Sequence, residues 1–264
     1  TEGILVFRSS ERREIEEVLL FDPYIELKYG KEKTGSNQIV IVYSASNILK
    51  LKVGSVFQAV NLIKHIKEAI KDCPYTKYNR FASFAPMRPQ SHIRWFVDSK
   101  DLFESIYYSL LEAKKEVLLS FWCLSPYLYL LRPIKSWDDE SRLDRVLKKI
   151  ADRGVKVYIF LFSGIKFILN FQGKENCKYL ESLSPNIKAL WNPSIPITLT
   201  SHHEKLVVID QEIAFLGGID LAYGRFDTRE HLLYDPVLED GSGYMFPGAD
   251  FQNERIQELD LRVP

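Results

Sequence analysis

The chain has 264 residues, of which 46% are hydrophobic and 27% charged, and its 35 Lys and Arg residues balance its 35 Asp and Glu residues. This length fits one large domain, or one domain with part of a second, and the neutral balance excludes a global attraction to nucleic acid. The three cysteines do not suggest a disulfide framework and favour a reducing, intracellular setting. No signal peptide is visible and the first residue is not Met, so we expect the natural chain to begin upstream.

Residues 1–73 are predicted to form a small antiparallel β domain closed by one helix. Stretches rich in β-branched and aromatic residues predict strands over 4–7, 17–21, 39–43 and 48–53. Apolar residues at helical spacing predict a helix over 56–70. Lys64, Lys67 and Lys71 on this helix form either a solvated face or a lipid-binding stripe. Residues 74–91 contain three prolines and little apolar periodicity, which indicates a linker.

Residues 92–264 change to an alternation of helices and strands. We expect helices near 102–111, 143–151 and 174–184, and strands over 117–121, 155–162, 187–191, 205–209 and 213–216. Ser141 is the expected N-cap of the second helix, and Gly154 its left-handed C′ residue. The near-continuous apolar strand 155–162 is typical of a parallel sheet covered on both faces. The alternation predicts a layered α/β fold. The apolar stretch 155–171 is too short and too interrupted to span a bilayer.

The pattern His203-x-Lys205-x4-Asp210 carries the chemistry. Alternate side chains of a strand share a face, so His203 and Lys205 should project together, while Leu206 and Val208 point into a core. An imidazole beside an ammonium suits attack on a phosphodiester, with the histidine as nucleophile or proton donor and the lysine opposing phosphate charge. Asp210 has the opposite parity, so we expect it to brace the turn or the motif.

A second group of residues follows the next strand. Gly217 and Gly218 would let the backbone approach a ligand and turn N–H groups toward an anion, and Asp220 would enter the same pocket as a polar contact with substrate. The neighbouring His202 should face away from the pocket and act structurally. Chance would supply about 0.02 matches to the H-x-K-x4-D pattern in such a chain.

The segments 202–211 and 214–227 resemble the first catalytic half of animal- and fungal-type phospholipase D. Shorter runs resemble that family as well, at 80–86, 94–98, 124–126, 132–133, 152–157, 185–188 and 246–250. The first segment resembles the later strands and closing helix of the family's pleckstrin-homology (PH) domain. The chain departs from the family pattern at residues 121–123, Tyr127, Phe226 and Ala249, which affects pocket shape and headgroup selectivity.

The resemblance implies a fold and an activity. The fold would be an α/β layered β-α-β-α sandwich half, with a partial PH-like domain at 1–73, a linker at 74–91 and an incomplete catalytic half at 92–264. The activity would be hydrolysis of phosphatidylcholine to phosphatidate and choline through a phosphohistidine, without a cofactor or catalytic metal. Asp235 would be the carboxylate that orients His203. The protein would be intracellular and peripheral to the membrane, and its PH-like part would bind anionic lipids.

The family uses two facing motifs, and no second H-x-K-x4-D occurs here. We expect the other half to come from a continuation of the chain past Pro264, or from a homodimer that pairs two copies of His203. Two other functions remain open. One is a related phosphodiesterase or nuclease, although we expect no nucleic-acid partner; the other is a non-catalytic lipid-binding fragment.

Overall fold

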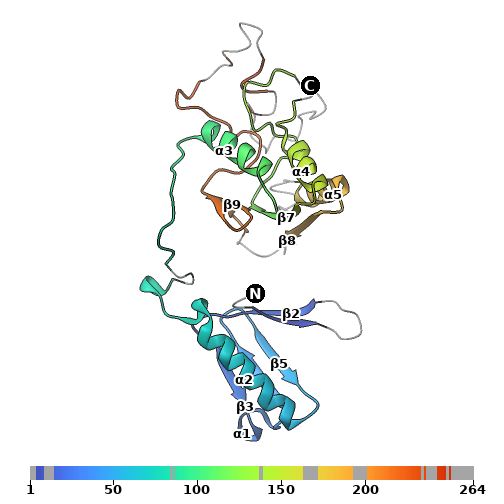
Figure 1. The fold of residues 1–264 in the computed structure, drawn as a ribbon. Helices are drawn as coiled ribbons and strands as arrows, with labels where there is room; N and C mark the ends of the chain where they lie inside the picture. Colours follow the sequence, from blue (N-terminus) through green and yellow to red (C-terminus); the bar gives the residue numbers. More distant parts are fainter. Residues whose placement is uncertain are drawn as a thin grey trace. The chain divides into compact units, whose positions relative to one another are not determined.

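The computed structural model describes residues 4–8, 15–83, 85, 87–136, 139–162, 172–192, 201–232, 235, 243–247 and 250. The chain divides into two compact units, Thr1–Ile93 and Arg94–Pro264 (Figure 1). The expected linker 74–91 falls within the first unit, where Thr76 donates to the carbonyl of Ile70 at 2.8 Å and Arg88 donates to the hydroxyl of Tyr75 at 3.2 Å. The assignment of the first unit to the PH type stays a prediction.

The first unit contains two small antiparallel sheets and one long helix. Strands β1 (Ile4–Arg8) and β2 (Ile15–Leu20) form one sheet, and β3 (Glu26–Tyr29), β4 (Ile39–Tyr43) and β5 (Ile48–Lys52) form the other. A short helix, α1 (Lys31–Thr34), lies between β3 and β4, and α2 (Val56–Asp72) follows β5. Ser55 caps α2 by accepting the N–H of Gln58 at 3.1 Å. The buried residues of α2, Ala59 and Ile66, join β4 in one core.

The second unit is built on one five-stranded sheet of order β10-β9-β6-β7-β8. Its strands are β6 (Glu116–Phe121), β7 (Lys156–Phe162), β8 (Ile187–Asn192), β9 (Lys205–Ile209) and β10 (Ile213–Leu216). β6, β7 and β8 run parallel, whereas β9 pairs antiparallel with both β6 and β10. Helices α3 (Ser99–Leu111), α4 (Leu143–Asp152) and α5 (Gly173–Leu183) connect or flank these strands (Figure 1). The expected α/β fold is confirmed.

Burial alternates along the strands, and this corrects two expectations. Val157, Ile159 and Leu161 of β7 are buried with the helices, whereas Tyr158 and Phe160 are exposed. In the described part of the chain, β7 is therefore covered on one face rather than on both. On β9 the buried residues are Lys205, Val207 and Ile209, and Leu206 and Val208 are only half-buried. The prediction that Leu206 and Val208 enter the core was wrong, because the motif lysine itself lies on the helix-covered face.

Only one of the two ends of α4 lies where the sequence predicted it. Gly154 has a φ of +97° and follows the last helical turn, as predicted. The N-cap is Arg142 and not Ser141, because the chain enters the helix one residue later than the spacing suggested. Arg142 supports that entry through two bonds to Asp144, at 2.8 and 2.9 Å. Among the residues that the structure describes, none of the helices combines the length and hydrophobicity needed to span a bilayer.

Candidate active site

The spacing of His203 and Lys205 brings an imidazole and an ammonium to one aromatic ring. β9 begins at Lys205, opposite Phe121 of β6, and the N–H of Trp122 donates to the carbonyl of Glu204 at 3.1 Å. This pairing places the indole of Trp122 beside the motif. The His203 ring centroid lies 4.9 Å from the Trp122 ring, and the Lys205 Nζ lies 5.3 Å from it. The two motif side chains therefore gather at one indole.

Lys205 is buried and its ammonium has unused donors. Its Nζ lies 3.1 Å from Oδ2 of Asp220, while Oδ1 of Asp220 accepts the N–H of Cys123 at 3.1 Å. Asp220 balances the charge of Lys205, but their contact does not have the geometry of a hydrogen bond. Within the described residues, Nζ therefore has no hydrogen-bond acceptor. Leaving the donors of a buried cation unfilled is costly. A ligand oxygen would remove that cost.

The two glycines after β10 leave open space beside the motif. A Cβ added at Gly217 or at Gly218 would meet no atom within 4 Å. The N–H of Gly217 donates to the carbonyl of Lys205 at 3.3 Å, so it extends the strand pairing instead of facing an anion. Close approach of a ligand to these glycines stays a prediction. Direct contact between Asp220 and substrate also stays a prediction, since both carboxylate oxygens already meet protein groups.

Asp210 braces the motif from the far end of β9. Its carboxylate accepts the backbone N–H groups of Lys114, Lys115 and Glu116 at 2.9, 2.7 and 2.9 Å. Burial raises the pKa of Asp210, but the bonds from Glu116, Lys114 and Lys115 outweigh it and hold that pKa below its usual value. The residue has a left-handed φ of +53°, as the turn between β9 and β10 requires. It ties β9 to the start of β6.

His202 lies on the opposite side of the chain from His203, as predicted. Its Nε2 lies 3.0 Å from the Ser120 hydroxyl and 3.2 Å from Glu204, and its ring packs on Phe160 at 4.8 Å. Hydrogen bonds to His202 and then Ser120 hold the pKa of Glu204 below its usual value. These contacts belong to the exposed face of the sheet. They support a structural role for His202.

Asp235 anchors a later part of the chain. Its Oδ2 accepts the N–H groups of Met245 and Phe246 at 2.8 and 2.9 Å. In the described part of the chain, the ring of His203 has no hydrogen-bond partner. The orienting role of Asp235 toward His203 therefore stays a prediction.

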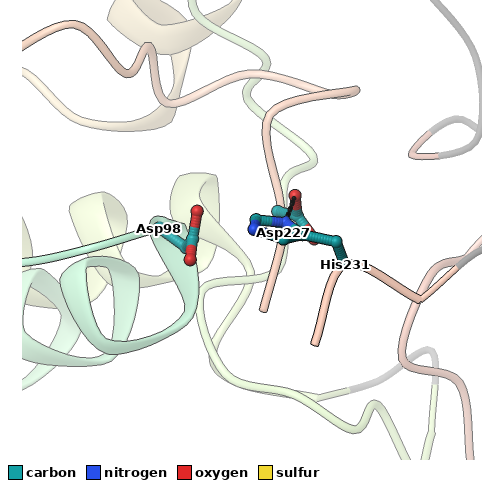
Figure 2. A group of neighbouring side chains, drawn as sticks. All are labelled: Asp98, Asp227 and His231. Atoms are coloured by element: carbon teal, nitrogen blue, oxygen red, sulfur yellow. Dashed lines mark hydrogen bonds and ion pairs between the residues drawn. The ribbon is translucent and has the colours of Figure 1, made fainter. Parts of the chain in front are cut away.

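Sequence reasoning did not identify a further charged cluster, Asp98, Asp227 and His231 (Figure 2). The Nδ1 of His231 lies 2.7 Å from Oδ2 of Asp227, and one potential ligand atom from each residue lies within 4.8 Å of the others. The hydrogen bond to Asp227, the charge of Asp227 and that of Asp98 raise the pKa of His231. The two carboxylates favour the protonated form of His231, and this attraction accounts for the cluster. Asp98 and His231 are far apart in sequence, so no local pattern predicts it.

The chain was compared with known protein families, curated proteins and solved structures. A family model described as Phospholipase D matches residues 109–256, just over half of the chain. The chain is 38% identical to Phospholipase D2 of Bos taurus over 236 residues, covering 89% of this chain and 25% of that protein. It is 36% identical to Phospholipase D1 of Saccharomyces cerevisiae over 251 residues, covering 90% and 15%. Among solved structures, NucT from Helicobacter pylori is 20% identical with a TM-score of 0.36, covering 50% of this chain and 74% of that one. The chain thus spans a quarter or less of the length of the two phospholipase D relatives.

Proposed function

Because the chain belongs to the phospholipase D family, we propose that it supplies one half of a phospholipase D active site. His203 is the nucleophile in this proposal, and Lys205 is the cation that holds the phosphate. The substrate is a membrane phosphodiester, with phosphatidylcholine as the specific proposal. No cofactor enters the reaction as we propose it.

The observation that carries this proposal is the buried ammonium of Lys205 with unused donors. Asp220 balances its charge at 3.1 Å, yet Nζ has no hydrogen-bond acceptor among the described residues. A non-bridging phosphate oxygen fits such a donor in charge and in size. His203 stands at the same indole, so a phosphate held by Lys205 would lie within reach of an imidazole.

The chemistry then runs in two steps. A ring nitrogen of His203 attacks phosphorus, the bond from phosphorus to the choline oxygen breaks, and choline leaves with a proton from a second acid. Water then gives a proton to that same second group, now a base, and attacks phosphorus; the phosphorus–nitrogen bond breaks, and phosphatidate is released. Lys205 stabilises the negative charge on the phosphate oxygens in both steps. Asp220 positions Lys205, and Asp210 holds β9 in place.

The second acid must come from another half of the enzyme. One histidine cannot be both the nucleophile and the acid that protonates the leaving group in the same step. We propose that a second motif faces His203, supplied by a longer chain or by a second copy of this one. Asp235 completes the proposal as the carboxylate that orients His203 once the site is assembled. The enzyme would act inside the cell from the membrane surface, with anionic lipids bound by the first unit.

The test compares two adjacent histidines. In the protein that carries both motifs, His203→Asn should abolish choline release from phosphatidylcholine vesicles, whereas His202→Asn should retain most of it. His202 is a matched control because it lies next to His203 but contacts Ser120 and Phe160 on the other face of the sheet. A single-turnover assay with phosphorus-labelled lipid should trap an acid-labile phosphoprotein in the His202 variant and none in the His203 variant.

Two outcomes would reject the proposal. Full turnover by the His203→Asn variant would remove the nucleophile from the mechanism. Cleavage of short DNA at a rate above that of phosphatidylcholine, lost in the same variant, would support a nuclease instead.

A further inference from the structure

Arg132 and Asp250 form an ion pair that is completely withdrawn from water in the second unit. Nη2 of Arg132 lies 2.6 Å from Oδ2 of Asp250, and both side chains are 0% exposed. The other guanidinium nitrogens donate to the protein as well, Nε to the carbonyl of Tyr129 at 3.1 Å and Nη1 to the carbonyl of Met245 at 2.7 Å. The guanidinium carbon lies 4.6 Å from the ring centroid of Phe226. The pair is therefore part of the protein interior.

Stability alone is a poor reason for such a pair. Two charges lose their hydration on burial, and their attraction often returns no more than this loss. Burial raises the pKa of Asp250, and the opposing effects of Arg132 and of the N–H of Gly224 do not cancel that increase. A hydrophobic pair would fill the same space without this cost. What a hydrophobic pair lacks is directed hydrogen bonds, which hold the surrounding segments in one arrangement.

The carboxylate of Asp250 holds the segment that continues from Asp220. Its Oδ1 accepts the N–H of Gly224 at 3.3 Å. Nearer to Asp220, the carbonyl of Leu221 accepts the N–H of Ser125 at 2.9 Å. The segment that begins at Asp220 is therefore fixed at both ends, by the residues that follow β6 and by the buried ion pair.

The guanidinium of Arg132 holds the segment that binds Asp235. The carbonyl of Met245 accepts from Arg132, while the N–H of Met245 donates to Oδ2 of Asp235 at 2.8 Å. Ile134 and Tyr244 add two backbone hydrogen bonds between the same parts of the chain, at 2.8 and 2.9 Å. The position of the Asp235 carboxylate thus depends on a residue that Arg132 fixes.

We propose that Arg132 and Asp250 are positioning residues for the phosphodiester reaction. Asp250 keeps in place Asp220, whose Oδ2 lies 3.1 Å from the ammonium of the motif lysine. Arg132 keeps in place Asp235, the carboxylate that orients the nucleophilic histidine in the proposed function. In the part of the chain that the structure describes, neither side chain hydrogen-bonds to the motif, so both act through these two carboxylates. The inference rests on the proposed function, since the groups that are positioned are those of that reaction.

The test removes the ion pair from the protein that carries both motifs. Arg132→Met/Asp250→Leu should lower choline release from phosphatidylcholine vesicles by roughly ten- to a hundredfold, because small displacements of catalytic groups are costly. The acid limb of its kcat/KM profile should also move to lower pH. A correctly placed carboxylate raises the pKa of the nucleophilic imidazole, which must be unprotonated to attack. Asp235→Asn should move that limb in the same direction, whereas a purely structural loss would leave it in place.

A second arginine–aspartate pair in the same unit is the matched control. Arg142 donates to Asp144 at 2.8 and 2.9 Å, and the side chain of Asp144 is 3% exposed. In the described part of the chain, this pair supports the start of α4 and binds the hydroxyl of Tyr179, but it does not hydrogen-bond to Gly224 or Met245. Arg142→Met/Asp144→Leu should therefore lower the urea midpoint of unfolding about as much, while turnover and the pH profile stay near those of the wild type.

A milder substitution covers the case in which Arg132→Met/Asp250→Leu does not fold. Asp250→Asn keeps the shape of the side chain and removes its charge. When it is combined with Asp235→Asn, the loss of turnover should be clearly smaller than the product of the two single losses, because both changes affect the orientation of the same histidine. When it is combined with Asp144→Asn, the two losses should multiply.

The inference is overturned if the variants of both arginine–aspartate pairs lose turnover equally, if the acid limb stays in place, or if the losses at Asp250 and Asp235 multiply. The variant His203→Asn keeps the two proposals apart. Abolished turnover in that variant, together with wild-type turnover in Arg132→Met/Asp250→Leu, would remove only this inference. Full turnover in His203→Asn would instead remove the proposed function itself.

Discussion

The Nζ of Lys205 lies 3.1 Å from Oδ2 of Asp220, and the two side chains are only 5% and 2% exposed. The pair joins the first residue of β9 to the segment after β10, and Oδ1 of Asp220 extends the link to the N–H of Cys123 after β6. One carboxylate thus fixes the ammonium relative to three neighbouring parts of the sheet. Lys205 is held in place before any substrate arrives.

Removing one partner of this pair should destabilise the protein. Asp220→Asn leaves a buried ammonium without a counterion, so the free energy of unfolding should fall by about 3 kcal/mol. Lys205→Met should cost a similar amount, and the double variant should cost less than the sum, because it leaves neither charge unpaired. Urea unfolding of the four proteins measures this coupling. Additive losses would show that the two groups do not interact.

The bonds to Asp210 predict a dependence of stability on pH. Because the pKa of Asp210 is lowered in the folded protein, its contribution is present above the unfolded pKa of about 3.9 and is lost as the pH falls through the lower folded value. Asp210→Asn keeps one acceptor oxygen, so at pH 7 it should lose about 1 kcal/mol of unfolding free energy. The difference from wild type should shrink below about pH 4. Asp152→Asn, at an exposed carboxylate paired with Lys148, is the control and should change little.

The sequence predicted the strands best where their pattern was strong. The β-branched and aromatic residues of β4 and the apolar runs of β9 and β10 predicted the observed bounds, because these residues favour strands and lie between clear turns. β3 and α1 were missed, since four residues with mixed polarity give no usable period. We expected both faces of β7 to be covered, but only one is. Its residues are apolar on both faces, so the sequence cannot indicate which face the helices cover.

The sequence predicted those features of the site that involve residues close together in the chain, but not the contacts between distant residues. The spacing of His203 and Lys205 is local, and so is the turn position of Asp210. The partners of Asp220 and Asp210 are not local: Cys123 donates to Asp220, and the segment 114–116 donates to Asp210, because β6 lies next to β9 in the sheet. The role of Trp122 follows from the same pairing, so sequence spacing alone could not reveal it.

His231 should titrate above its ordinary range. The bond to Asp227 and the charge of Asp98 raise its pKa in the folded protein. The protonated form therefore adds stability below the unfolded pKa of about 6.5, and this stability is lost as the pH rises through the higher folded pKa. NMR titration should show that Asp227→Asn lowers the pKa of His231 clearly. Glu230→Gln should lower it less, since Glu230 is the weakest of these influences. Equal effects of the two substitutions would contradict the contact in Figure 2.

Trp122 should position the two motif side chains through its ring. Its ring centroid lies 4.9 Å from that of His203 and 5.3 Å from the Lys205 Nζ, and a cation–π contact such as the one with Lys205 contributes about 0.5–2 kcal/mol. Trp122→Phe keeps an aromatic face, whereas Trp122→Leu removes it. In the protein that carries both motifs, the leucine variant should therefore lose roughly tenfold more turnover than the phenylalanine variant.

A second tryptophan separates positioning from general packing. A similar contact occurs at Trp191, near the end of β8, where the Nζ of Lys174 lies 5.6 Å from the ring centroid. Trp191→Leu should lower the unfolding free energy about as much as Trp122→Leu, because each removes one indole–ammonium contact. It should leave turnover near the wild-type value, since Trp191 contacts neither His203 nor Lys205 in the described part of the chain. Equal losses of turnover at both tryptophans would mean that Trp122 acts through the stability of the sheet and not by holding the motif.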